Sequence, residues 1–242
     1  MIIERIKRKI EPQMFIVPQS TPVIYFGNYD KARACTISLN PSKKEFVDNK
    51  DNLLVGKKER LCSRLRLNKK DADCLSNSDA DIIIDCCNNY FRNNPYRNWF
   101  NKYEYMIKKF GYSYFNDTCV HLDLVQWSTS PFWDGLDDKI KAIHLKNDLP
   151  VLEYLLNNKK FEIIFLNGNT VVDNVKKYMK NITINEKDAI YCNKNSYSIN
   201  IKVYIGNYKN IKIIGWSPYL QSPTIGGYDN IDILYDTIIR FI

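Results

Sequence analysis

Short apolar runs bounded by turn residues occur four times along the chain and predict four buried strands. They span residues 34–40, 117–127, 161–167 and 211–217. Continuous apolar runs of this length, without polar alternation, are typical of strands that are covered on both faces of a sheet. Two further stretches, residues 21–28 and 198–206, could add edge strands or a hairpin.

Between these runs, apolar residues recur at steps of three or four, which is the spacing of an amphipathic helix. This pattern predicts helices within residues 103–110, 149–156, 167–181 and 230–242. Asp148 is the expected N-cap of the second helix, and Asn169 or Thr170 that of the third. Strands that alternate with helices imply an α/β fold, in which three α/β/α layers surround a mostly parallel four-stranded sheet.

Polar, aromatic or small residues follow each predicted strand. They lie at 40–42, 126–129, 167–169 and 216–218. In open sheets of this kind, ligands bind beyond the carboxyl ends of the strands. Turn residues also occur at such ends for structural reasons alone. On the topological rule, we expect the four strand ends to open onto one shared site.

Composition narrows the class of protein. The chain has 242 residues, of which 45% are hydrophobic and 26% charged, so we expect one globular domain over residues 1–242. The net charge of +8 suits a polyanion such as nucleic acid, but it equally suits a lysine-rich solvated face. No apolar run approaches the length of about 18 residues that would span a membrane.

The seven cysteines and two histidines bear on metal and compartment. The cysteines are odd in number and form no CxxC pair, which is typical of reduced thiols in a cytosol. His121 and His144 form no HExxH pattern, which argues against a zinc site. With no signal peptide visible at the first residues, we expect a cytoplasmic monomer without a metal or another cofactor.

Four motifs occur in a particular order along the chain. SLNPS ends at Ser42, LDLVQWSTSPFW covers 122–133, IIFLNGNTVVDNV covers 163–175, and IIGWSPYLQSP covers 213–223. This order resembles that of the uracil-DNA glycosylase superfamily. SLNPS is similar to its first motif, which in the mismatch-specific branch reads Gly-Ile-Asn-Pro-Gly. IIGWSPYLQSP takes the place of its second motif, usually His-Pro-Ser.

The chain departs from the superfamily pattern at two places. Trp216, Ser217 and Pro218 stand where the second motif has its histidine, and Ser42 stands in place of a glycine. NPS followed by Glu45 and Phe46, NPYR at 94–97 and HLDLV at 121–125 resemble an uncharacterised bacterial group of relatives. Some antiphage members of the superfamily remove bulky modified bases from phage DNA, and the resemblance extends to them.

The resemblance implies a monofunctional, metal-independent DNA glycosylase. Such an enzyme hydrolyses the N-glycosidic bond of a flipped-out damaged or modified base, and it needs a positioned water. Asn40 would orient that water through its amide carbonyl, although a turn or cap role is also open. Asp123 or Glu45 would polarise the water or stabilise the positively charged sugar. Asp123 and His121 share a strand face, so a structural hydrogen bond between them is an alternative.

The remaining candidates would recognise DNA. The expected base-binding residues are Phe46, Tyr96, Trp127 and Phe132 for stacking, and Asn167 and Gln221 for the base edge. These aromatic residues could equally belong to the core. The expected DNA-backbone contacts are Ser42, Lys43, Lys44, Arg92, Arg97, Ser217 and Ser222.

Two other functions stay open. One is a nucleic-acid-binding module that keeps the fold without the chemistry, which the missing histidine favours. The other is a hydrolase of free nucleosides or nucleotides. A nucleoside or nucleotide hydrolase predicts no salt-dependent DNA binding, whereas the glycosylase and the binding module both predict it.

Overall fold

The computed structural model describes residues 1–71, 73–194 and 198–242. Its α-helices are α1 (Ile2–Lys7), α2 (Asn77–Asn88), α3 (Arg97–Lys109), α4 (Asp138–Asn157), α5 (Asn169–Tyr178) and α6 (Tyr228–Ile238). Its strands are β1 (Ala34–Ser38), β2 (Cys119–Asp123), β3 (Ile163–Asn167), β4 (Ile182–Cys192), β5 (Ser198–Tyr208) and β6 (Ile211–Trp216).

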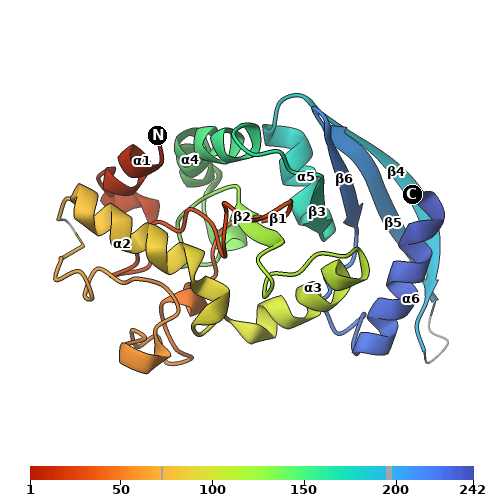
Figure 1. The fold of residues 1–242 in the computed structure, drawn as a ribbon, viewed down its shortest axis with the longest axis horizontal. Coiled ribbons are helices and arrows are strands. Elements are labelled where there is room, and N and C mark those ends of the chain that lie inside the picture. The colour runs from red at the N-terminus through yellow and green to blue at the C-terminus, as the bar shows by residue number, and fades with distance from the viewer. Residues whose placement is uncertain (72, 195–197) are drawn as a thin grey trace. The chain divides into compact units, whose positions relative to one another are not determined.

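The six strands form one mixed sheet in the order β2-β1-β3-β6-β5-β4 (Figure 1). β1 pairs in parallel with β3, and β3 pairs in parallel with β6. β5 pairs antiparallel with both β6 and β4. The predicted α/β class is therefore confirmed. The sheet has six strands rather than the predicted four, because β4 and β5 add a long hairpin. The stretch 198–206, which the sequence offered as an edge strand or part of a hairpin, lies within β5.

Burial explains which strands could be predicted. Every residue of β1, β2 and β3 is buried, as expected for apolar runs covered on both faces. β4 is an edge strand, and most of its residues are exposed or only half-buried. The stretch 21–28 forms no strand, although Phe26 makes one isolated antiparallel bridge to His121.

The four predicted helices are present as parts of α3, α4, α5 and α6, but α4 begins earlier than predicted. It starts at Asp138, and the side chain of Asp137 accepts a hydrogen bond from the Lys139 backbone N–H at 2.8 Å. The prediction that Asp148 caps this helix is wrong. Asp148 lies inside α4 and is fully buried, because its carboxylate pairs with a buried arginine described below.

The chain divides into two compact units. Unit 1 comprises residues 1–30, 39–96 and 121–159, and unit 2 comprises residues 31–38, 97–120 and 160–242. Unit 1 contains α1, α2, α4 and the segments that follow β1 and β2. Unit 2 contains most of the sheet with α3, α5 and α6, and α3 and α6 lie side by side in Figure 1. The single domain stays a prediction.

Two observations concern thiols and membranes. All seven cysteines are free. Among the described residues, no helix combines the length and the apolar character that crossing a membrane requires.

Candidate active site

In unit 1, the Asn40 side chain is fixed at one end. Its Nδ2 donates to the backbone oxygen of Trp127 at 3.1 Å and to Oγ1 of Thr129 at 3.2 Å. A backbone hydrogen bond of 2.9 Å from Val125 to Leu39 holds the same two segments together. Asn40 is half-buried, and no donor to its Oδ1 is present in the part of the chain that the structure describes. The amide oxygen is thus left as an acceptor.

Ser42 and Lys43 have local partners in this structure. The Ser42 hydroxyl accepts a hydrogen bond from the Lys44 backbone N–H at 3.2 Å and so caps a short 3-10 helix, Lys43–Glu45. The Lys43 ammonium pairs with Asp51 at 2.8 Å. Because the Ser42 oxygen accepts, its hydroxyl proton stays available to a ligand such as phosphate.

Glu45 is fully buried at the end of this helix, with 2% of its surface exposed. The hydroxyl of Tyr90 donates to Glu45 Oε2 at 2.7 Å, and the same hydroxyl accepts the Tyr96 backbone N–H at 2.8 Å. Burial raises the pKa of Glu45 to about 8, and the negative charge of Asp123 acts in the same direction, against Tyr90 and Arg60. Glu45 therefore carries a proton at neutral pH.

Asp123 ends β2 and is also buried, with 3% of its surface exposed. Neither carboxylate oxygen has a hydrogen-bond partner among the described residues. The imidazole Nε2 of His121 lies 3.5 Å from Asp123 Oδ1. The Phe26 ring lies 5.3 Å from the His121 ring and 4.7 Å from that of Tyr90. A buried carboxylate without hydrogen bonds is costly, which marks Asp123 as a functional candidate.

The stacking candidates differ in exposure. Phe46 and Trp127 are each 2% exposed and belong to the core of unit 1. Tyr96 is half-buried, and the guanidinium of Arg60 lies 5.0 Å from its ring centroid. Phe132 is exposed beside Lys43, whose ammonium lies 5.6 Å from the ring. Tyr96 and Phe132 are therefore the accessible rings of this set.

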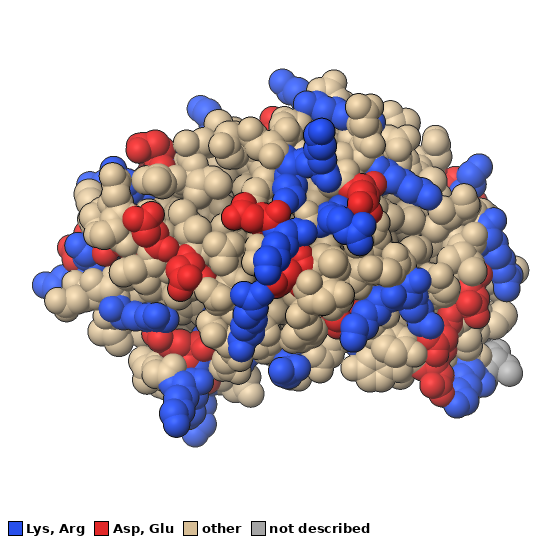
Figure 2. Space-filling model, in the orientation of Figure 1, with Lys and Arg blue, Asp and Glu red and all other residues tan. Residues whose placement is uncertain are grey.

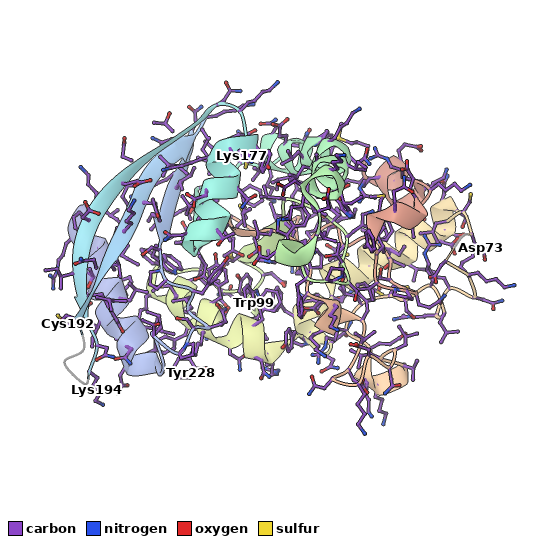
Figure 3. The ribbon with its side chains drawn as sticks, turned by 180° about the vertical axis from the view of Figure 1, so that it is seen from behind. Asp73, Trp99, Lys177, Cys192, Lys194 and Tyr228 are labelled. Carbon is purple, nitrogen blue, oxygen red and sulfur yellow. The ribbon has the colours of Figure 1, made fainter. Side chains whose placement is uncertain are left out.

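In unit 2, Asn167 is fully buried where β3 ends next to β6. Its Oδ1 accepts the Trp216 indole N–H at 2.8 Å and the Leu220 backbone N–H at 3.0 Å. Its Nδ2 donates to Gln221 Oε1 at 3.0 Å, and Gln221 Nε2 donates to the backbone oxygen of Trp99 at 2.7 Å (Trp99 is labelled in Figure 3). In this arrangement, neither amide presents both of its polar groups to a ligand.

Ser217 and Ser222 line an open pocket of about 390 Å³ in unit 2. The Ser217 hydroxyl oxygen accepts the Lys202 backbone N–H at 3.0 Å, so its proton remains available. Ser222 Oγ is buried and has no hydrogen-bond partner among the described residues. The ring of Tyr219 also lines this pocket. The two serines therefore line the same pocket, and their contact with a phosphate backbone stays a prediction.

Basic side chains are spread over the surface. Arg97 is exposed, and its guanidinium lies 5.5 Å from the ring centroid of Phe115. Arg92 is exposed, and Lys44 is half-buried with its ammonium on the Asp48 backbone oxygen at 2.6 Å. Figure 2 shows lysines and arginines interspersed with acidic residues over the visible face. Charge alone therefore does not mark a DNA-binding surface on this face.

The candidates thus fall into two sets. Unit 1 holds Asn40, Ser42, Lys43, Glu45, Phe46, Tyr96, Asp123 and Trp127, and unit 2 holds Arg97, Asn167, Ser217, Gln221 and Ser222. The prediction of one shared site for all four strand ends stays a prediction. Sequence reasoning missed Tyr90 and Thr129, which hold Glu45 and Asn40. Thr129 lies in the predicted 126–129 segment, whereas nothing in the sequence signals Tyr90.

Comparison with known proteins does not assign the chain to a family. No protein-family model matches the chain, and no curated protein matches it. Within the described ranges, no group of three or more His, Cys, Asp or Glu side chains is arranged to hold a metal ion.

Proposed function

We propose that this protein is a DNA glycosylase with a uracil-DNA glycosylase-like fold. It hydrolyses the N-glycosidic bond of a flipped-out damaged or modified base, such as a modified phage cytosine. In this proposal the fold has three α/β/α layers, the protein is a cytoplasmic monomer, and the reaction needs no metal. The observation that carries it is the fixation of Asn40, which leaves an amide oxygen next to an Asn-Pro-Ser turn.

Asn40 orients the attacking water in this proposal. Because both hydrogen bonds of Nδ2 hold the amide in place, Oδ1 can accept a hydrogen bond from a water in a single orientation. An amide is too weak a base to deprotonate that water. It therefore contributes by position, and the water attacks C1′ of the sugar as the bond to the base breaks.

Asp123 supplies the negative charge that this reaction needs. A carboxylate lowers the energy of a sugar with oxocarbenium character, and it can take the proton that the water loses. Asp123 has no competing hydrogen bond in the described part of the chain. Glu45 carries its proton up to a pKa of about 8, so it is unsuited to that role near neutral pH.

A DNA-binding module without catalytic activity is the second candidate. One specific observation favours it. Trp216 stands in place of the motif histidine, is fully buried and gives its indole N–H to Asn167. It therefore cannot assist a departing base as that histidine would.

Labelled DNA separates the two candidates. We would incubate the protein with DNA that contains uracil, a mismatched thymine, hypoxanthine, hydroxymethylcytosine or glucosylated hydroxymethylcytosine, and then break abasic sites with alkali. The glycosylase predicts strand breaks at one of these bases that form at least about 100-fold more slowly with Asn40→Ala. The matched control is Asn158→Ala, because this exposed asparagine donates its side-chain amide to the backbone oxygen of Tyr154 in α4, away from the proposed chemistry. No breaks, with salt-sensitive DNA binding intact, would favour the binding module.

A further inference from the structure

The short helix α1 delivers one buried arginine to unit 1. Arg5 Nη2 lies 2.7 Å from Asp148 Oδ1 on α4, and the two side chains are 1% and 0% exposed. α1 and α4 lie side by side in Figure 1. Nothing in the apolar pattern of the sequence signals this ion pair, because its members are far apart along the chain.

The same ion pair holds Gln126 by its backbone and by its side chain. The Gln126 backbone N–H donates to Asp148 Oδ2 at 3.0 Å. Its side-chain Oε1 accepts Arg5 Nε at 3.4 Å, and its Nε2 donates to the backbone oxygen of Asp123 at 3.3 Å. We call Arg5, Asp148 and Gln126 the clamp.

The next residue connects the clamp to Asn40. The guanidinium carbon of Arg5 lies 5.2 Å from the ring centroid of Trp127, which is buried. The backbone oxygen of Trp127 accepts one hydrogen of the Asn40 amide at 3.1 Å. The clamp therefore contacts the segment that carries Asp123 and the segment that anchors Asn40.

A contribution to stability alone does not explain why Arg5 and Asp148 are charged residues at buried positions. Burying an ion pair removes two charges from water, and well-packed apolar side chains of similar volume are often as stabilising or more so. Arg5 adds a link from this ion pair to Gln126, because its Nε donates to Gln126 Oε1 while Nη2 meets Asp148 by charge, without a hydrogen bond among the described residues. The residue held in this way, Gln126, follows the segment of Asp123 and precedes Trp127, whose backbone oxygen binds the Asn40 amide.

We infer that Arg5, through Asp148 and Gln126, is a positioning residue for Asn40. This inference rests on the proposed function. The clamp fixes the position of the Trp127 carbonyl. That carbonyl fixes the orientation of the Asn40 amide, and the amide oxygen in turn orients the attacking water. Arg5 itself touches none of the reacting atoms.

The test replaces the pair together, so that no single charge is left buried. Arg5→Met with Asp148→Asn removes both charges, keeps an unbranched apolar chain at position 5 and keeps an acceptor for the Gln126 N–H. We expect the single-turnover excision rate to fall about 10- to 100-fold, as for a small misplacement of a reacting group, with DNA affinity unchanged. In an Asn40→Ala background, the same pair of changes should alter the residual rate less than about twofold, since coupled residues are not additive.

Arg8→Met is the matched control. Arg8 lies just beyond α1 and donates to the Asn147 backbone oxygen on α4 at 2.9 Å, but it is exposed. It therefore tests the docking of α1 without the clamp. We expect it to leave the excision rate unchanged.

Hydrogen exchange of the backbone amides of residues 123–130 tests the clamp independently of enzymatic activity. We expect faster exchange in the Arg5→Met, Asp148→Asn protein and none of this effect in Arg8→Met. Unchanged exchange would refute the clamp, and a full rate loss in the Asn40→Ala background would refute its action through Asn40. A wild-type protein that excises no base would instead refute the proposed function, so the two failures are distinguishable.

Discussion

Replacement of Glu45 by glutamine should stabilise the protein at alkaline pH. Burial raises the pKa of Glu45 from 4.5 to about 8. The folded protein therefore keeps a proton that the unfolded chain has already released between these two values. This stabilisation is fully present below about pH 4.5 and is lost as the pH rises through about 8. Glutamine has no such proton to lose and still offers an oxygen to the Tyr90 hydroxyl.

The magnitude follows from the difference between the two pKa values. Each pKa unit corresponds to about 1.4 kcal/mol, so wild type should lose about 4 kcal/mol relative to Glu45→Gln between pH 5 and pH 8. Urea unfolding of both proteins at several pH values, followed by tryptophan fluorescence, measures this difference. Parallel pH profiles of wild type and variant would refute the buried, protonated Glu45.

Glu186→Gln is the control for this measurement. Glu186 is exposed, and hydrogen bonds from Lys176 and Lys202 lower its pKa to about 2. Both the folded and the unfolded chain have released this proton above about pH 5. Its replacement should therefore leave the pH profile of unfolding unchanged in the same range.

Three other changes test single contacts. Asp123→Asn should slow base excision about 100-fold while the thermal midpoint stays equal or rises, because a buried carboxylate without hydrogen bonds is removed. Asn167→Ala should lower the free energy of unfolding in urea by about 3 kcal/mol, since a buried indole N–H and a backbone N–H lose their acceptor. Gly168→Ala should cost at least about 2 kcal/mol in the same assay, because φ is 100° and the new Cβ would lie 2.6 Å from the Tyr219 ring. An unchanged excision rate for Asp123→Asn, or an unchanged free energy of unfolding for either of the other two variants, would contradict the prediction concerned.

The elements with a buried face could be predicted from the sequence. β1, β2, β3 and β6 consist mostly of apolar residues, and nearly all of their residues are buried. β4 could not be predicted, since an exposed edge strand has no apolar pattern to detect. The start of α4 was misplaced because Asp148 followed by Pro150 resembles a helix start, although both lie inside the helix.

The candidate site was predictable only in part. The strand-end rule and the motifs indicated Asn40 and Asp123. In the structure Asn40 is held by hydrogen bonds, and the carboxylate of Asp123 has none among the described residues. The contact of Glu45 with Tyr90 joins residues 45 positions apart, and such pairs carry no periodic signal. For Asn167 the strand-end rule indicated a ligand-binding residue, but in the structure this side chain forms its hydrogen bonds within the protein.

Detection of a released base tests the central claim most directly. Wild type and Asn40→Ala would be incubated with DNA that carries each candidate base, and the free bases in solution would be measured by mass spectrometry. We expect wild type to release one damaged or modified base, and Asn40→Ala, with the same DNA affinity, to release that base at least about 100-fold more slowly. Release of the same base at the same rate by both proteins, or by neither while DNA is bound, would contradict it.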